Sequence, residues 1–208
     1  MKKDNIYQPI KNGFTLIEVL VASAILVLLA FGFLGLQYII SQNQVTVWRD
    51  YLSIDSANSA LNTIIKELRN IQESENGSYP LEKAEDQEII FYSDYDNDGK
   101  VERIRYTLSD SNLLKGVIKP TGIPATYPIA NEKTKIISEI IRNESEPIFF
   151  YYNSNWPEDT VNNPLIQSER ISKTRLIKIV LKANPRKSDS RNNYLLESAT
   201  NIRVFLTD

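Results

Sequence analysis

The chain has 208 residues, and its 42% hydrophobic content is enough for a membrane segment and one globular domain of ordinary size. Its 24 basic and 26 acidic residues nearly balance, so the charge gives no reason to expect nucleic acid as the main partner. Cysteine and histidine are both absent, which excludes disulfides, thiolate metal sites, cysteine nucleophiles and a Ser-His-Asp triad. We therefore do not expect an enzyme.

The first element along the chain is an apolar stretch at residues 14–40, whose only formally charged side chain is Glu18. As a helix it would be about 40 Å long, enough to cross a hydrocarbon core of about 30 Å with some tilt. An ordinary secretory signal has a shorter apolar core that ends at a small-residue cleavage site. Lys2, Lys3 and Lys11 precede the stretch and favour a cytoplasmic N-terminus. We expect a single-pass membrane helix with the rest of the chain outside the cytoplasm.

The same helix is predicted to continue beyond the membrane, because no proline interrupts residues 10–79. An apolar stripe continues there at helical spacing, with Asn58 in the one skipped place and Glu67 away from the stripe. The residues of the stripe are Val47, Tyr51, Ile54, Leu61, Ile65 and Leu68. One helix is therefore expected from residue 14 to about residue 72, and residues 41–75 form its amphipathic half.

Residues 76–208 are predicted to form a β-rich head, because short apolar runs alternate there with turn residues. The candidate strands are residues 88–93, 101–109, 113–119, 148–153, 174–183 and 202–206. In the second of them, Ile104, Tyr106 and Leu108 share one face, which is typical of an antiparallel sheet with one covered face. The helix stripe is the expected cover. A short helix is expected at residues 134–142, between loops.

The loop between the first two predicted strands is acidic. Its carboxylates are those of Asp94, Asp96 and Asp98, with Glu102 nearby. The order matches the opening of a calcium loop, D-x-D-x-D-G, but Arg105 stands where the bidentate glutamate of that loop is expected. A looser calcium site is one interpretation, and calcium is the only cofactor that the sequence suggests. The other, which we favour, is a hairpin turn in which Gly99 supplies a positive φ.

Two further patterns each have two interpretations. The aromatic run at residues 149–152, with Trp156 nearby, is typical of a strand with one face in a core, and a stacking platform for nucleic acid is the alternative. Basic residues are denser from 178 to 191. That density is typical of a solvated strand face and loop, and weak DNA contact is the alternative.

The residues that follow Gly13 carry the most specific motif of the chain. The string GFTLIEVLVA, behind a short basic leader, closely resembles the class III signal of type IV prepilins and pseudopilins. The resemblance implies that a prepilin peptidase cleaves between Gly13 and Phe14, which removes residues 1–13 as a leader, and that Phe14 is then N-methylated. Glycine before the cut lets an extended backbone enter a protease site without a side-chain clash.

Glu18 would be the fifth residue of the mature chain. A charged side chain in an apolar helix costs about 2.5–3.5 kcal/mol at mid-membrane and less near the interface. In the resembled family this glutamate neutralises the N-terminal ammonium of its own or a neighbouring chain, which implies an assembly role. The alternative is a carboxylate that reaches the interface without a partner. Gly32 and Gly35 lie where the family often carries helix-breaking residues, and close helix packing explains them equally well.

The later motifs, in their order, look like those of J-type minor pseudopilins and the related W-type minor pilins. They are the Asp-Gly hairpin, Arg-x-Arg-Tyr-x-Leu at 103–108, Phe-x-Tyr at 149–151, Arg-Leu-Ile-Lys-Ile at 175–179 and Asn-Ile-Arg at 201–203. The resemblance implies a pilin-like α+β fold, in which a long N-terminal helix packs on an antiparallel β-sheet head.

The function implied by the resemblance is that of a minor pilin or pseudopilin, a structural subunit that helps to initiate or assemble a type IV pilus-like or type II secretion filament. The implied partners are prepilin peptidase, other pilin or pseudopilin subunits and the inner-membrane assembly platform. The chain would lie in the cytoplasmic membrane before it joins the filament. The alternative function is a filament-displayed binding module, either an adhesin or a DNA-uptake receptor for competence, that uses the loops between residues 120 and 193.

Overall fold

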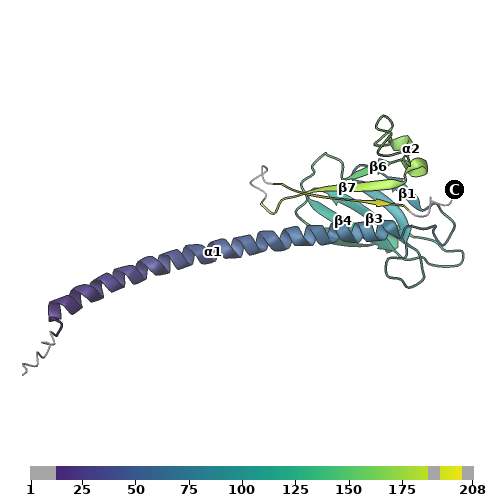
Figure 1. The fold of residues 1–208 in the computed structure, drawn as a ribbon. Helices are drawn as coiled ribbons and strands as arrows, with labels where there is room; N and C mark the ends of the chain where they lie inside the picture. The colour runs from purple at the N-terminus through teal and green to yellow at the C-terminus, as the bar shows by residue number, and fades with distance from the viewer. Residues whose placement is uncertain (1–12, 187–192, 203–208) are drawn as a thin grey trace, which may run out of the picture. The chain divides into compact units, whose positions relative to one another are not determined.

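A long helix, α1 (Leu16–Arg69), dominates the computed structural model, which describes residues 13–186 and 193–202 (Figure 1). The chain divides into two compact units, Met1–Trp48 and Arg49–Asp208. Helix α1 begins in the first unit and ends in the second. The prediction of one helix from residue 14 to about residue 72 is therefore confirmed, with both ends slightly shorter.

The first unit presents the apolar half of α1. Every described residue of this unit is exposed, and Phe14 and Leu28 are 88% and 72% exposed. The mean hydropathy reaches 2.7 over an 18-residue window, and none of that window is buried. By length and composition this is the one helix of the described chain that could cross a membrane. Such a surface requires lipid or other apolar helices around it.

The second unit contains two antiparallel sheets, which confirms the α+β class. The larger sheet has the order β1-β2-β3-β4-β5. Its strands are β1 (Leu81–Ala84), β2 (Glu88–Ser93), β3 (Glu102–Ser109), β4 (Asn112–Ile118) and β5 (Lys133–Ser138). The smaller sheet consists, in order, of β6 (Phe149–Tyr152), β7 (Leu176–Ala183) and β8 (Tyr194–Asn201). Two short helices, η1 (Ile129–Asn131) and α2 (Gln167–Lys173), lie in the connections.

One core joins the last turns of α1 to both sheets. The helix contributes Ala57, Leu61, Ile64, Ile65 and Leu68. Strands β3 and β7 alternate between buried and partly exposed residues along their length, so each covers the core with one face only. The predicted inward face of β3, formed by Ile104, Tyr106 and Leu108, is confirmed. In Figure 1 the C-terminal part of α1 runs alongside β3 and β4.

The buried stripe of α1 starts later than predicted. Val47 and Tyr51 are 62% and 59% exposed, so burial begins only at Ala57. The predicted stripe had a gap at Asn58, and that residue is exposed. The buried residue at this level of the helix is Ala57, one position earlier. The prediction extended the stripe too far because helical spacing shows which residues share a face but not how much of that face a sheet covers.

Residues 134–142 were wrongly predicted to form a short helix. Most of this segment belongs to β5, which pairs antiparallel with β4 through partners such as Leu114 and Ile136. The spacing of Ile136, Ile137, Ile140 and Ile141 fits one helix face, but β-branched side chains favour a strand, and β4 offers a free edge for pairing. The five predicted strands between residues 88 and 183 correspond to β2, β3, β4, β6 and β7, whereas β1, β8 and α2 were not predicted.

The last predicted strand, residues 202–206, falls outside the described residues except at Ile202. That residue is buried in the core, and it follows β8 without being part of it. The described head contains two sheets, whereas the sequence predicted a single sheet. In the smaller sheet β7 is the central strand, which pairs with both β6 and β8.

Candidate functional site

The start of α1 places the predicted processing and assembly residues next to one another. Gly13 and Phe14 are exposed and lie outside the helix, just before its first turn. The Glu18 carboxylate accepts hydrogen bonds from the Thr15 backbone N–H at 2.8 Å and from the Thr15 hydroxyl at 2.9 Å. In return, the Glu18 backbone N–H donates to the Thr15 hydroxyl oxygen at 3.4 Å. This reciprocal pair is a capping box, which satisfies backbone donors at the helix N-terminus.

Thr15 is the residue of this site that the sequence analysis missed. The pattern Thr-x-x-Glu at residues 15–18 is itself the signature of a capping box, so the signal was present. Its consequence is geometric. The capping box turns the Glu18 carboxylate toward the residues that precede the helix, where Gly13 and Phe14 lie.

The acidic loop between β2 and β3 is a turn, as favoured from the sequence. Both carboxylate oxygens of Asp94 accept backbone N–H groups, from Asp98 at 3.1 Å and from Gly99 at 3.0 Å. Gly99 has a φ of +82°, which confirms the predicted positive value, and Asn97 also lies in the left-handed region with a φ of 57°. The turn is longer than a two-residue hairpin, because it comprises residues 94–101, between the paired strand ends Ser93 and Glu102.

The three aspartates of this loop do not converge on one point. Carboxylate oxygens of Asp94, Asp96 and Glu102 lie within 4.8 Å of one another, and Asp98 is not part of that group. The ammonium of Lys119 lies 2.9 Å from carboxylate oxygens of both Asp96 and Asp98. Burial raises the pKa of Glu102 to about 7, the nearby Asp96 carboxylate adds to this shift, and Lys119 opposes it.

A buried polar cluster joins α1 to the larger sheet. Glu67, which was predicted to lie away from the buried stripe, is only 6% exposed. Its carboxylate accepts hydrogen bonds from the Tyr106 hydroxyl at 2.6 Å and from the Lys115 ammonium at 2.5 Å. Burial and the neighbouring Glu67 carboxylate raise the pKa of Tyr106 well above its usual value. The prediction failed at Glu67 because partners from β3 and β4 make its burial favourable.

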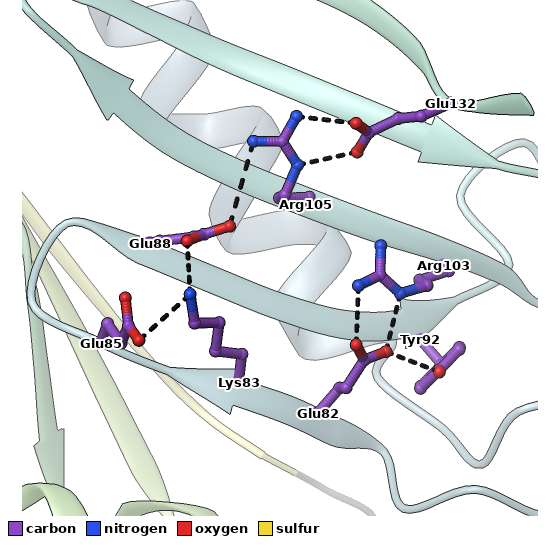
Figure 2. Close-up of polar contacts among 8 residues, drawn as sticks. All are labelled: Glu82, Lys83, Glu85, Glu88, Tyr92, Arg103, Arg105 and Glu132. Carbon is purple, nitrogen blue, oxygen red and sulfur yellow. Dashed lines mark hydrogen bonds and ion pairs between the residues drawn. The ribbon is translucent and has the colours of Figure 1, made fainter. Parts of the chain in front are cut away.

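The outer face of the larger sheet carries ion pairs between its strands (Figure 2). Arg105 on β3 binds the Glu132 carboxylate through two nitrogens, at 2.8 and 2.7 Å, and lies 3.9 Å from Glu88 on β2. This hydrogen bonding lowers the pKa of Glu132. Lys83 on β1 contacts both Glu88, at 2.7 Å, and Glu85, at 3.1 Å. These contacts fix the register of the strands rather than form a reactive centre.

A second group of the same face centres on Glu82 of β1. Its carboxylate accepts two hydrogen bonds from Arg103, at 2.7 and 2.6 Å, and one from the Tyr92 hydroxyl at 2.7 Å (Figure 2). Arg103 and Tyr92 are register partners on β3 and β2, so Glu82 links three neighbouring strands. The bidentate geometry is the one in which an arginine and a carboxylate interact most strongly.

The aromatic and basic patterns both have structural explanations. Residues 149–152 form β6, and Phe149, Tyr151 and Tyr152 are buried. The described basic residues of the 178–191 segment lie against carboxylates. These pairs are Lys178 with Glu197, Lys182 with Glu146, and Arg186 with Asp50. Residues 187–192 lie outside the described part of the chain, so this segment was tested only in part.

A capped apolar helix that continues into an antiparallel β head is the architecture predicted from the sequence. Residues 10–34 match the prokaryotic N-terminal methylation motif, a stretch that contains Gly13, Phe14 and Glu18. The prediction of a prepilin-type N-terminus is thus confirmed. The motif and the apolar helix together indicate a membrane-anchored N-terminus.

Similarity to known proteins is otherwise distant. No curated protein matches this chain in sequence. Among solved structures, a chain of the GspK-GspI-GspJ complex from the type 2 secretion system of enterotoxigenic Escherichia coli is similar at a TM-score of 0.44 and 10% sequence identity. The similarity covers 73% of this chain and 97% of that one.

Proposed function

We propose that this chain is a minor pilin or pseudopilin, a structural subunit that helps to initiate or assemble a type IV pilus-like or type II secretion filament. The observation that carries the proposal is the combination of a methylation motif at residues 10–34 with an apolar helix that no described part of the chain covers. A helix of this kind is stable in lipid, and it is equally stable against similar helices of neighbouring subunits.

The maturation step follows from the same segment. Prepilin peptidase would cleave between Gly13 and Phe14, and the new ammonium of Phe14 would then be methylated. Exposure of both residues outside the helix favours access to this bond, because a protease binds extended backbone. The cleaved chain would begin one residue before Thr15, the partner of Glu18 in the capping box.

Assembly would then use Glu18 as the partner of an N-terminal ammonium. A carboxylate and an ammonium attract one another far more strongly in an apolar surrounding than in water. The ammonium of a neighbouring subunit would therefore be drawn to Glu18 as its helix leaves the membrane, which sets the register of the two helices. The proposed partners are other pilin or pseudopilin subunits and the inner-membrane assembly platform, and the head would lie outside the cytoplasm.

The test replaces the carboxylate and leaves the helix intact. Glu18→Ala should insert into the membrane and be cleaved normally, yet its share of the sheared filament fraction should fall at least tenfold, as measured by immunoblot. Ser23→Ala is a matched control, because Ser23 is an exposed polar residue of the same helix whose hydroxyl donates to the Leu20 carbonyl. Normal incorporation of Glu18→Ala would contradict the proposal, and so would an equal loss in the control.

The alternative, a filament-displayed binding module, makes a different prediction in the same cells. A deletion strain is complemented with a chain altered only in the loops between residues 120 and 193. Filament number should fall if the head serves assembly. Intact filaments that have lost adhesion or DNA uptake would instead support the binding module.

A further inference from the structure

Glu102 is the least satisfied polar group of the described head. It begins β3 and is 0% exposed, and neither of its carboxylate oxygens has a hydrogen-bond partner. The nearest cationic group is the Lys119 ammonium, at 3.6 Å. Burying a carboxylate away from water is costly unless a cation or hydrogen-bond donors replace the water. The Tyr95 backbone N–H also points to this carboxylate, but it falls short of the geometry of a full hydrogen bond. A fully buried carboxylate with only these two weak contacts indicates room for a further ligand.

The surroundings of Glu102 fit a metal ion. One oxygen each from Asp94, Asp96 and Glu102 lie within 4.8 Å of one another. Oxygens on opposite sides of a calcium ion are about 4.6–5.2 Å apart, because each Ca–O bond is about 2.3–2.6 Å long. The three oxygens can therefore contact one such ion from one side. Asp94 remains available as a ligand although it accepts two backbone N–H groups, since each carboxylate oxygen has a second lone pair.

The charge at this place is unbalanced without an added cation. Three carboxylates, those of Asp96, Asp98 and Glu102, lie within 3.6 Å of the Lys119 ammonium. Asp94 adds a fourth negative charge beside two of them, whereas Lys100 adds one positive charge near Asp98. The Lys119 side chain is 51% exposed, so its flexible stem can carry the ammonium back into water. Calcium brings two charges in place of one, and it takes six to eight oxygen ligands, some of them water.

We propose that Asp94, Asp96 and Glu102 bind one calcium ion, and that the Lys119 ammonium neutralises Asp96 and Glu102 when the ion is absent. The structure thus revises the ligand set read from the sequence, because Glu102 takes the place that the D-x-D-x-D-G pattern gives to Asp98. Binding of the ion would fix the loop between β2 and β3. The ion and the lysine compete, so each weakens the contacts of the other.

The test is calorimetric titration of the full chain in nonionic detergent micelles with calcium chloride. The wild-type chain should bind one equivalent, Glu102→Gln should weaken binding at least tenfold, and Lys119→Met should strengthen it at least threefold. Glu132→Gln is the matched control, because it removes a carboxylate that directly precedes β5 and already binds Arg105. Circular dichroism checks that each variant folds, and Asp96→Asn replaces Glu102→Gln if that variant does not.

Two outcomes contradict the proposal. One is the absence of a saturable calcium signal in both the wild type and Lys119→Met. The other is unchanged affinity in a folded Glu102→Gln or Asp96→Asn variant. A purely structural role for Lys119 is distinguished by thermal unfolding. Under the proposal, calcium raises the unfolding temperature of Lys119→Met by more than that of the wild type, whereas under the structural role calcium raises neither.

Discussion

The two halves of α1 have the same backbone conformation but opposite surroundings. No described residue up to Trp48 is buried, although this half is the more apolar. Seven residues between Ala57 and Leu68 are buried, and one of them is the carboxylate-bearing Glu67. Hydrophobicity therefore does not decide which residues of this helix pack within the chain. The first half is built for partners outside the chain, and the second half for the strands that follow it.

The largest difference in the free energy of unfolding is expected between a core substitution in the head and a substitution in the exposed half of α1. Phe91 on β2 is fully buried and stacks on Tyr106 with ring centroids 6.1 Å apart. Phe91→Ala should reduce the free energy of unfolding of the head by about 4 kcal/mol, because it leaves a cavity. Leu28→Ala, at a residue that is 72% exposed, should leave that free energy unchanged. Urea unfolding in detergent, followed by near-ultraviolet circular dichroism, measures both, and equal losses would contradict the comparison.

A somewhat smaller effect is expected at the one carboxylate of α1 that enters the core. Lys115→Met removes the cation beside Glu67 and should cost about 3 kcal/mol, because a buried charge loses its partner. The double variant Glu67→Gln with Lys115→Met should recover most of this loss, since no buried charge remains and the amide oxygen can still accept the Tyr106 hydroxyl. The same unfolding experiment measures both variants. A double variant that is less stable than Lys115→Met would show that the ion pair itself stabilises the head.

The smallest change in the free energy of unfolding is expected for the ion pair between Arg105 and Glu132 on the outer face of the sheet. It should appear only at a pH at which Glu132 is ionised. Because Arg105 lowers the pKa of Glu132 in the folded chain, the pair stabilises the head above the ordinary carboxyl pKa of about 4.5 and loses this effect as pH falls through the lower folded pKa. Glu132→Gln should therefore cost about 1 kcal/mol at pH 7 and nearly nothing at pH 2.5. Unfolding midpoints across this range test the sign. A constant difference would contradict the assignment.

Gly116→Ala offers an independent check of the same pair. A Cβ at Gly116 would contact the Glu132 carboxylate oxygen too closely, so the carboxylate must move away from Arg105. This variant should reproduce the pH dependence of Glu132→Gln, with a smaller loss at pH 7 because a long side chain can adjust. An unchanged pH profile would show that the ion pair tolerates the added methyl group.

The sequence predicts well those features that depend on neighbouring residues. The apolar helix, the alternation of β3 and the positive φ of Gly99 each follow from a short stretch of chain. The processing motif is of the same kind, since its residues are consecutive. Thr15 was recognisable in the same way, through its spacing from Glu18.

The sequence predicts poorly those features that depend on contacts between distant residues. Residues 134–142 are rich in isoleucine, whose spacing fits a helix and whose branching favours a strand, and the free edge of β4 decides for β5. Burial of Glu67 depends on Tyr106 and Lys115, which lie 39 and 48 positions further along the chain. In the acidic loop, the fold brings Glu102 rather than Asp98 to the other carboxylates. No residue pattern within the loop distinguishes those two outcomes.

The central claim is that the chain is processed as a prepilin and assembled through its exposed helix. Intact mass spectrometry of the protein, purified from cells that contain a prepilin peptidase and from cells that lack it, tests this most directly. We predict a mature chain that begins at N-methylated Phe14 in the first cells and an uncleaved chain in the second. A filament-associated chain that begins at any other residue, or that keeps residues 1–13, would contradict the account.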